Sequence, residues 1–182
     1  MTYPPPAIQA TLVVLAVLGA IFDARQRRVP NWLTLAGLFL GIALNTFLFE
    51  TAGLWMSLEG LGLAMLVYFP LYLLRGMGAG DVKLMAAIGA LVGPVNWFGI
   101  LVLTALFGAI AALGAIALKG RFRQTMWNIW MILASIRIGQ APYKTNPELD
   151  ISSERSVRLP HAISIGLGTV VFLAAAAIWA PR

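Results

Sequence analysis

The sequence contains no cysteine and a single histidine, His161. Without cysteine the chain has no disulfide, no thiolate metal site and no cysteine nucleophile. One histidine does not make a zinc site of the usual kind, and His161 follows Pro160 at an expected helix start, so we interpret it as structural. We therefore expect no metal and no cofactor.

Charged residues are also scarce. They make up 11% of the 182 residues, whereas about a quarter of an ordinary soluble domain is charged. The net charge of +6 is divided among short clusters between apolar runs, a distribution typical of membrane orientation signals. These observations exclude an ordinary soluble domain and argue against nucleic acid as a partner.

Hydrophobic residues make up 60% of the chain and gather into long runs. A membrane-spanning helix needs about 17–25 residues, which the first and fourth runs reach only if they extend into their neighbours. The sequence thus predicts an all-α, polytopic membrane protein with about six transmembrane helices. The expected runs are 8–22, 32–49, 54–74, 84–92, 95–118 and a last one from Pro160 to near Trp179.

The only long polar stretch is 119–159. Its first half, 121–138, has an apolar core too short to span a bilayer, so we expect one cytoplasmic interfacial helix there, with Trp127 and Trp130 as interface anchors. Its second half, 139–158, is rich in Pro, Asn and Ser and is predicted to be loop. Nothing in it could form a second core, so we expect one membrane-embedded domain over residues 1–182.

The basic residues predict the orientation. Six spans put both termini on one side, and twelve of the thirteen Lys and Arg residues then fall on the other side. Basic loops stay in the cytoplasm, so we expect both termini outside. No Lys or Arg precedes the first run, which favours a retained span over a cleaved signal peptide. Asp23 and Asp81 then both lie at cytoplasmic helix ends.

These two acids, out of three aspartates in the chain, are the candidate site. Either acid alone is commonly a solvated group paired with arginine. Acids are costly near the bilayer, however, and tend to mark function there. Two carboxylates that share a site do not both ionise easily, so one keeps its proton while the other is a base. Such a pair could cut a peptide bond without a metal.

The segment that leads to Asp81 is Gly76-Met77-Gly78-Ala79-Gly80-Asp81-Val82-Lys83. Its glycines are either a flexible loop or a place where an extended substrate approaches the backbone, in conformations closed to other residues. Lys83 is either an orientation signal or a contact to an acidic group of the substrate. We name Gly78, Gly80 and Lys83 as candidate substrate-binding residues.

Two motifs resemble the type IV prepilin peptidases, within the wider Gly-x-Gly-Asp class of membrane aspartyl proteases. Residues 78–84 look like the second active-site motif of that family, and Asp23 followed by Val29-Pro30-Asn31 looks like the first. Residues 160–168 are more weakly similar to its proline-led last helix. The resemblance implies that Asp23 and Asp81 are the catalytic pair.

It also implies cleavage of a short basic leader from prepilin or pseudopilin precursors, at the cytoplasmic face of the bacterial inner membrane. The chain lacks the cysteine-bearing insertion of the fuller members, so N-methylation is not expected. It looks more like the compact branch that serves Flp (tight-adherence) pili. The expected partners are these precursors and the lipid bilayer, and the oligomeric state is left open.

Two other functions fit the same residues. The acids could form the proton relay of a proton-coupled carrier, although such sites lie near the midplane of the membrane. Alternatively, the chain could be a non-catalytic subunit of pilus assembly whose acids only pair with arginines.

Overall fold

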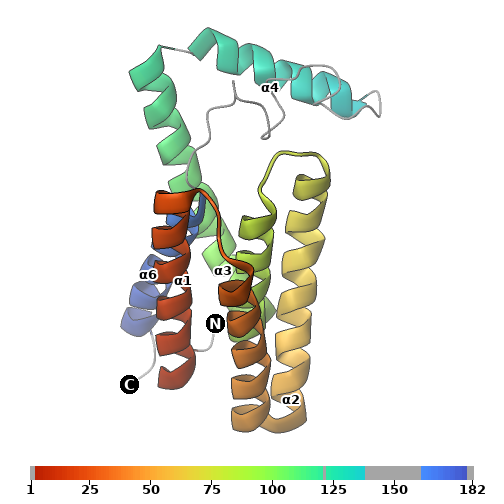
Figure 1. Cartoon of the computed structure of the whole chain (residues 1–182), viewed down its shortest axis with the longest axis vertical. Helices are drawn as coiled ribbons and strands as arrows, with labels where there is room; N and C mark the ends of the chain where they lie inside the picture. Colours follow the sequence, from red (N-terminus) through yellow and green to blue (C-terminus); the bar gives the residue numbers. More distant parts are fainter. Residues whose placement is uncertain (1–2, 121, 138–160, 180–182) are drawn as a thin grey trace.

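The computed structural model describes residues 3–120, 122–137 and 161–179. All regular structure in these residues is helical, which confirms the predicted all-α class (Figure 1). The helices are α1 (Pro6–Gln26), α2 (Asn31–Leu73), α3 (Ala79–Lys119), α4 (Phe122–Arg137) and α6 (His161–Trp179).

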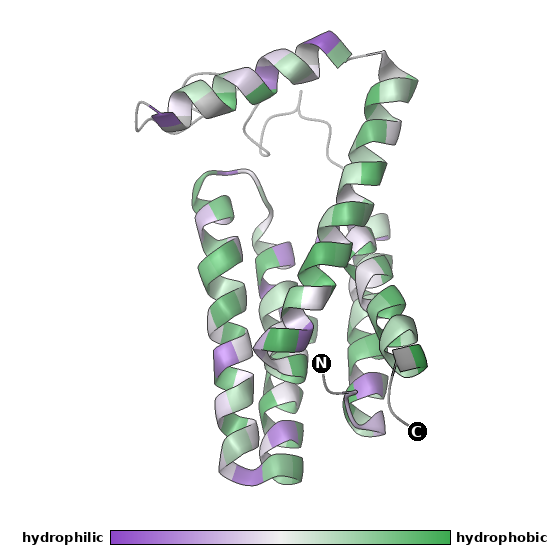
Figure 2. Ribbon diagram, turned by 180° about the vertical axis from the view of Figure 1, so that it is seen from behind, coloured by the Kyte–Doolittle hydropathy of each residue, from purple (hydrophilic) through white to green (hydrophobic). Residues whose placement is uncertain are grey.

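Four of these helices, α1, α2, α3 and α6, are long and apolar enough to cross a membrane. Hydrophobic residues predominate along most of their length (Figure 2). Large side chains such as Phe47 and Leu118 are 85% and 91% exposed. Monomeric soluble proteins rarely expose apolar surface on this scale, so the chain is a multi-pass membrane protein.

Helices α2 and α3 each contain one break. Glu50 has φ 54° and ψ −137° within α2, and Gly93 has φ 73° and ψ 174° within α3. Figure 1 shows α2 folding back on itself, so that its two arms lie side by side. The runs 32–49 and 54–74 thus form the arms of α2, and the runs 84–92 and 95–118 belong to α3. The predicted turn at 50–53 is reduced to Glu50.

A buried amide stabilises the break in α3. Asn45 Nδ2 lies 3.0 Å from the carbonyl oxygens of Gly41, Ala90 and Leu91 and donates to them. Ala90 lies four residues before Pro94, which has no N–H to offer that carbonyl. Asn45 on α2 therefore supplies the hydrogen bond that the helix loses at this point.

The first half of α3 is the centre of the molecule. Every residue from Leu84 to Gly93 is buried. Helix α2 approaches it through glycine, since a Cβ on Gly41 would lie 2.9 Å from the backbone nitrogen of Leu91. A small residue at this position lets the two helix backbones pack closely. Asp81 lies three residues before this buried half of α3.

Helix α4 lies across one end of the bundle (Figure 1). It exposes Trp127 and Trp130, whose rings stack with centroids 5.3 Å apart. Its bounds agree with the interfacial helix expected at 121–138. The loop predicted over 139–158 lies outside the described residues.

Candidate active site

Asp23 lies in the last turn of α1, and its side chain is 9% exposed. The helix ends at Arg27, which adopts a left-handed conformation (φ 52°, ψ 31°) and donates its backbone N–H to the Asp23 carbonyl oxygen at 2.8 Å. The chain then leaves the axis of α1 and enters α2 through Pro30, whose backbone is extended (φ −63°, ψ 139°). The Asp23 side chain therefore lies at the C-terminal end of α1, beside this short connection.

Asp81 lies in the first turn of α3, not in a loop before it. Gly78 is the residue that precedes the helix, and its carbonyl oxygen accepts the N–H groups of Asp81 and Val82 at 3.2 and 3.4 Å. An acidic side chain in the first turn interacts favourably with the unpaired N–H groups of the helix start. The buried half of α3 below it holds Asp81 in place.

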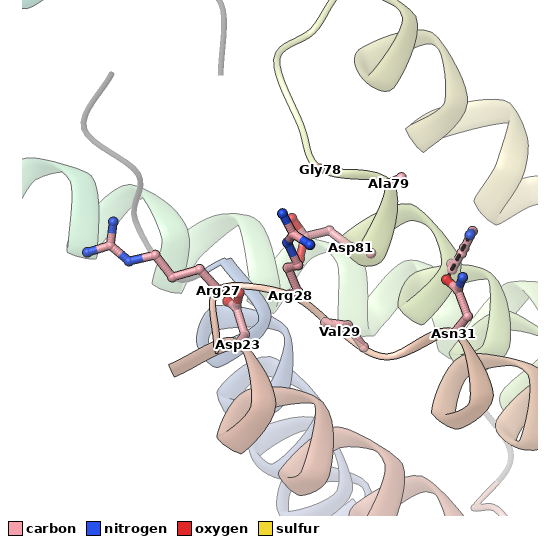
Figure 3. Close-up of a pocket in the computed structure, with 10 residues that line it drawn as sticks. Asp23, Arg27, Arg28, Val29, Asn31, Gly78, Ala79 and Asp81 are labelled. Atoms are coloured by element: carbon pink, nitrogen blue, oxygen red, sulfur yellow. Dashed lines mark hydrogen bonds between the residues drawn. The ribbon is translucent and has the colours of Figure 1, made fainter. Parts of the chain in front are cut away.

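Both aspartates line one cavity of about 300 Å³. The cavity is formed by two segments, the connection from α1 to α2 and the start of α3. Figure 3 shows the Asp81 side chain directed from α3 toward this connection. Asp23 lies at the end of α1, where the connection begins. The lining residues are Asp23, Arg27, Arg28, Val29, Asn31, Gly78, Ala79, Gly80, Asp81 and Lys83.

The structure thus brings together all five residues selected from the sequence, namely Asp23, Gly78, Gly80, Asp81 and Lys83. Two contacts join the segments that carry them. Lys83 Nζ donates a hydrogen bond to Asn31 Oδ1 at 2.9 Å. A Cβ on Gly80 would lie 3.3 Å from the backbone nitrogen and Cβ of the buried Val29.

The glycines serve close approach and not an unusual backbone conformation. Among the described residues, the glycines with positive φ are Gly93 and Gly120. Gly76, Gly78 and Gly80 therefore do not use the positive φ that glycine allows. The close packing at Gly80 is toward Val29 of the same chain, and a substrate-binding role for these glycines stays a prediction.

A third element reaches the site. The backbone N–H of Ala162, at the start of α6, donates to Asp23 Oδ2 at 3.1 Å. This contact is not predictable from the sequence, because a backbone donor has no residue signature. The only signal was Pro160, which predicted a helix start on the same face of the membrane.

Two arginines of the cavity are further site residues. The charge pattern of the sequence marks Arg27 and Arg28 only as orientation signals, yet both line the cavity beside the aspartates. With Lys83 they give the cavity three cationic side chains. The sequence feature that could have indicated them is their nearness to Asp23, which both follow within five positions.

The arrangement suits acid–base chemistry. Two carboxylates on separate elements share a space that could hold a substrate. Within residues 3–120, 122–137 and 161–179, no group of three or more His, Cys, Asp or Glu side chains is placed to hold a metal ion. A carboxylate pair can take a proton from water and give one to a carbonyl oxygen.

Comparison with known proteins agrees with this chemistry. A family model described as the type IV leader peptidase family matches residues 10–113, more than half of the chain. The matched part contains both Asp23 and Asp81. No curated protein and no solved structure matches the chain. On the strength of the family match, the chain belongs to the type IV leader peptidase family, the aspartic prepilin peptidases of the bacterial inner membrane.

Proposed function

We propose that the chain removes the basic leader peptide from type IV prepilins of the Flp kind, with Asp23 and Asp81 as the catalytic pair. One observation carries this proposal: two acids from different helices line the same cavity. The family match supports it, because it spans both acids.

The proposed reaction uses both carboxyl groups. The ionised one takes a proton from a water molecule as that water attacks the carbonyl carbon of the scissile peptide bond. The protonated one donates to the carbonyl oxygen, and the roles reverse when the tetrahedral intermediate releases the amine. General acid–base catalysis of this kind contributes roughly 10²–10⁴-fold in rate for each group.

Cleavage at this site favours an unwound substrate. In an α-helix each peptide group is hydrogen-bonded within the helix and covered by side chains. An extended backbone is thinner and exposes its peptide bonds. We therefore propose that the precursor enters the site as an extended strand.

We further propose that α2 and α3 each cross the membrane twice, which gives six crossings with α1 and α6. The positive-inside rule then places both termini outside and the cavity at the cytoplasmic face. Because the chain has no cysteine, single cysteines report the orientation cleanly. We expect Gln26→Cys to react with an impermeant maleimide only from the cytoplasm and Thr51→Cys only from the outside, and the opposite result would contradict this orientation.

The proposed product is an unmodified N-terminus. The connection between α1 and α2 comprises residues 27–30, so no cytoplasmic insertion separates these two helices. Nor does the chain contain the cysteine pair of that insertion. We expect mass spectrometry of the cleaved pilin to show a free, unmethylated amino group.

The function is tested by coexpression with candidate precursors that carry a short basic leader before an apolar helix. The wild-type chain should shift the precursor to higher mobility on a gel, and Asp23→Asn and Asp81→Asn should not. Glu59→Gln is the matched control, since Glu59 is an exposed acid outside the cavity lining. Cleavage that persists in the double Asn variant would favour an assembly subunit, and proton-linked uptake lost in the same variants would favour a carrier.

A further inference from the structure

Helix α6 contributes to the aspartate site although it lies outside residues 10–113, the part matched by the family model. Its contact is the Ala162 N–H, which donates to Asp23 Oδ2 at 3.1 Å. Both partners are buried, with Asp23 9% and Ala162 0% exposed. Water therefore competes little for this hydrogen bond.

Close helix packing places this N–H group. A Cβ on Gly166 would lie 3.3 Å from the carbonyl oxygen of Ala16 on α1. A Cβ on Gly168 would lie 2.8 Å from the backbone nitrogen of Thr104 on α3. The helix is thus held between α1 and α3 at backbone distance, and such close contacts leave it little room to slide.

The Ala162 N–H is available to bond Asp23 because of its place at the helix start. The first N–H groups of a helix have no acceptor within the helix, and Ala162 is the second residue of α6. Hydrogen bonds from backbone N–H to a carboxylate are charge-assisted and stronger than neutral ones. A helix start also favours a negative charge placed beside it.

We propose that the Ala162 N–H is a positioning group for Asp23: it holds Oδ2 and leaves Oδ1 to face the water and the substrate. The proposal rests on the function proposed above. It makes α6 part of the catalytic apparatus, and it gives the residues beyond the matched region a role in the reaction.

Other charged groups surround this contact. The other titratable or charged groups placed around Asp23 in the described residues are Asp81 and Lys83 on α3, Arg27 and Arg28 in the connection, and His161 on α6.

Ala162→Pro tests the proposal, because proline removes one N–H and is tolerated in the first turn of a helix. We expect kcat to fall by about 10–100-fold, the usual effect of losing a hydrogen bond to a charged group, with KM little changed. The pH–rate profile, whose midpoints belong to the aspartate pair, should differ from that of a matched control. Ile163→Pro is this control, since it places proline one residue later in the same turn and keeps both the Ala162 N–H and the His161 side chain.

Equal rates and equal pH profiles for Ala162→Pro and Ile163→Pro would overturn the proposal. A second measurement needs no helix variant. His161 is the only histidine, so ¹³C-carbonyl histidine combined with ¹⁵N-alanine labels one amide, that of Ala162. Its NMR shift should move in Asp23→Asn, which replaces the acceptor carboxyl group, and should stay in place in Glu59→Gln.

An Ala162 amide whose shift is the same in Asp23→Asn as in the wild type would contradict the contact. This outcome is distinct from failure of the proposed function, which would appear as a wild-type chain that cleaves no precursor. The NMR measurement does not depend on cleavage. The positioning role of Ala162 and the proposed cleavage function are therefore tested by different results.

Discussion

Lys83 Nζ donates a hydrogen bond of 2.9 Å to Asn31 Oδ1, and this contact joins the segment that follows Asp23 to the helix that carries Asp81. The same two segments meet a second time where Val29 packs on Gly80. The two halves of the site are therefore held together by the residues around the aspartates.

The contact predicts that Lys83 and Asn31 act as a unit. We expect Lys83→Ala and Asn31→Ala each to slow cleavage, and the double variant to be little slower than either one. Residues in direct contact show coupling energies of about 0.5–3 kcal/mol, which a double-mutant cycle on kcat/KM would measure. If Lys83 instead contacts an acidic group of the substrate, its loss will be independent of Asn31.

The glycines before Asp81 predict a graded series of alanine variants. A Cβ added to Gly80 would lie 3.3 Å from Val29, and one added to Gly78 would lie 3.4 Å from Asp81 Oδ2. A Cβ added to Gly76 would lie 3.5 Å from the Leu71 carbonyl oxygen. We expect Gly80→Ala to reduce cleavage most, because Val29 is buried and has little room to move. Gly76→Ala should be close to wild type in the same assay, and the reverse order would contradict the packing at Gly80.

Asn45 predicts an effect on stability away from the site. Its amide donates to three backbone carbonyls, and Asn45→Leu removes this donor from the Leu91 oxygen and from the Ala90 oxygen, which Pro94 has no N–H to pair. An unsatisfied buried group costs about 1–3 kcal/mol, so thermal unfolding in detergent should occur at clearly lower temperature. Ser57→Ala is the control, since Ser57 makes only a 3.4 Å contact to Gly41 and should change the midpoint little.

Much of this architecture follows from local patterns. Apolar runs and basic clusters are visible along the sequence, so the helical class and the positions of Asp23 and Asp81 at helix ends could be predicted. The interruptions near Glu50 and at Gly93-Pro94 were also visible. Such features depend on neighbours in the chain and not on the folded structure.

The contacts that complete the site depend on how helices dock. Whether Asn45 faces the carbonyls freed by Pro94 depends on the crossing of α2 and α3. The Ala162 N–H reaches Asp23 because of glycine packing on two other helices. The start of α3 was placed too late, since Ala79 and Gly80 favour a loop by composition while the Gly78 carbonyl accepts the first N–H groups of a helix.

The proposed mechanism predicts a bell-shaped dependence of kcat/KM on pH. At low pH both carboxyl groups are protonated and no base remains, and at high pH both are ionised and no acid remains. The two midpoints belong to the pair and not to either residue. Cleavage of a purified precursor, measured across pH in detergent, should therefore fall on both sides of one optimum, and a profile with a single limb would contradict a carboxylate pair.

The central claim is that Asp23 and Asp81 act together on one peptide bond. Residues that act as a unit in catalysis have non-additive effects. The most direct measurement is the single-turnover cleavage rate of a purified prepilin by Asp23→Asn, Asp81→Asn and the double variant, each shown to be folded and inserted. We predict that each single variant loses cleavage to the background rate and that the double variant is no slower than either. A single variant that still cleaves at a rate near that of the wild type would contradict the claim.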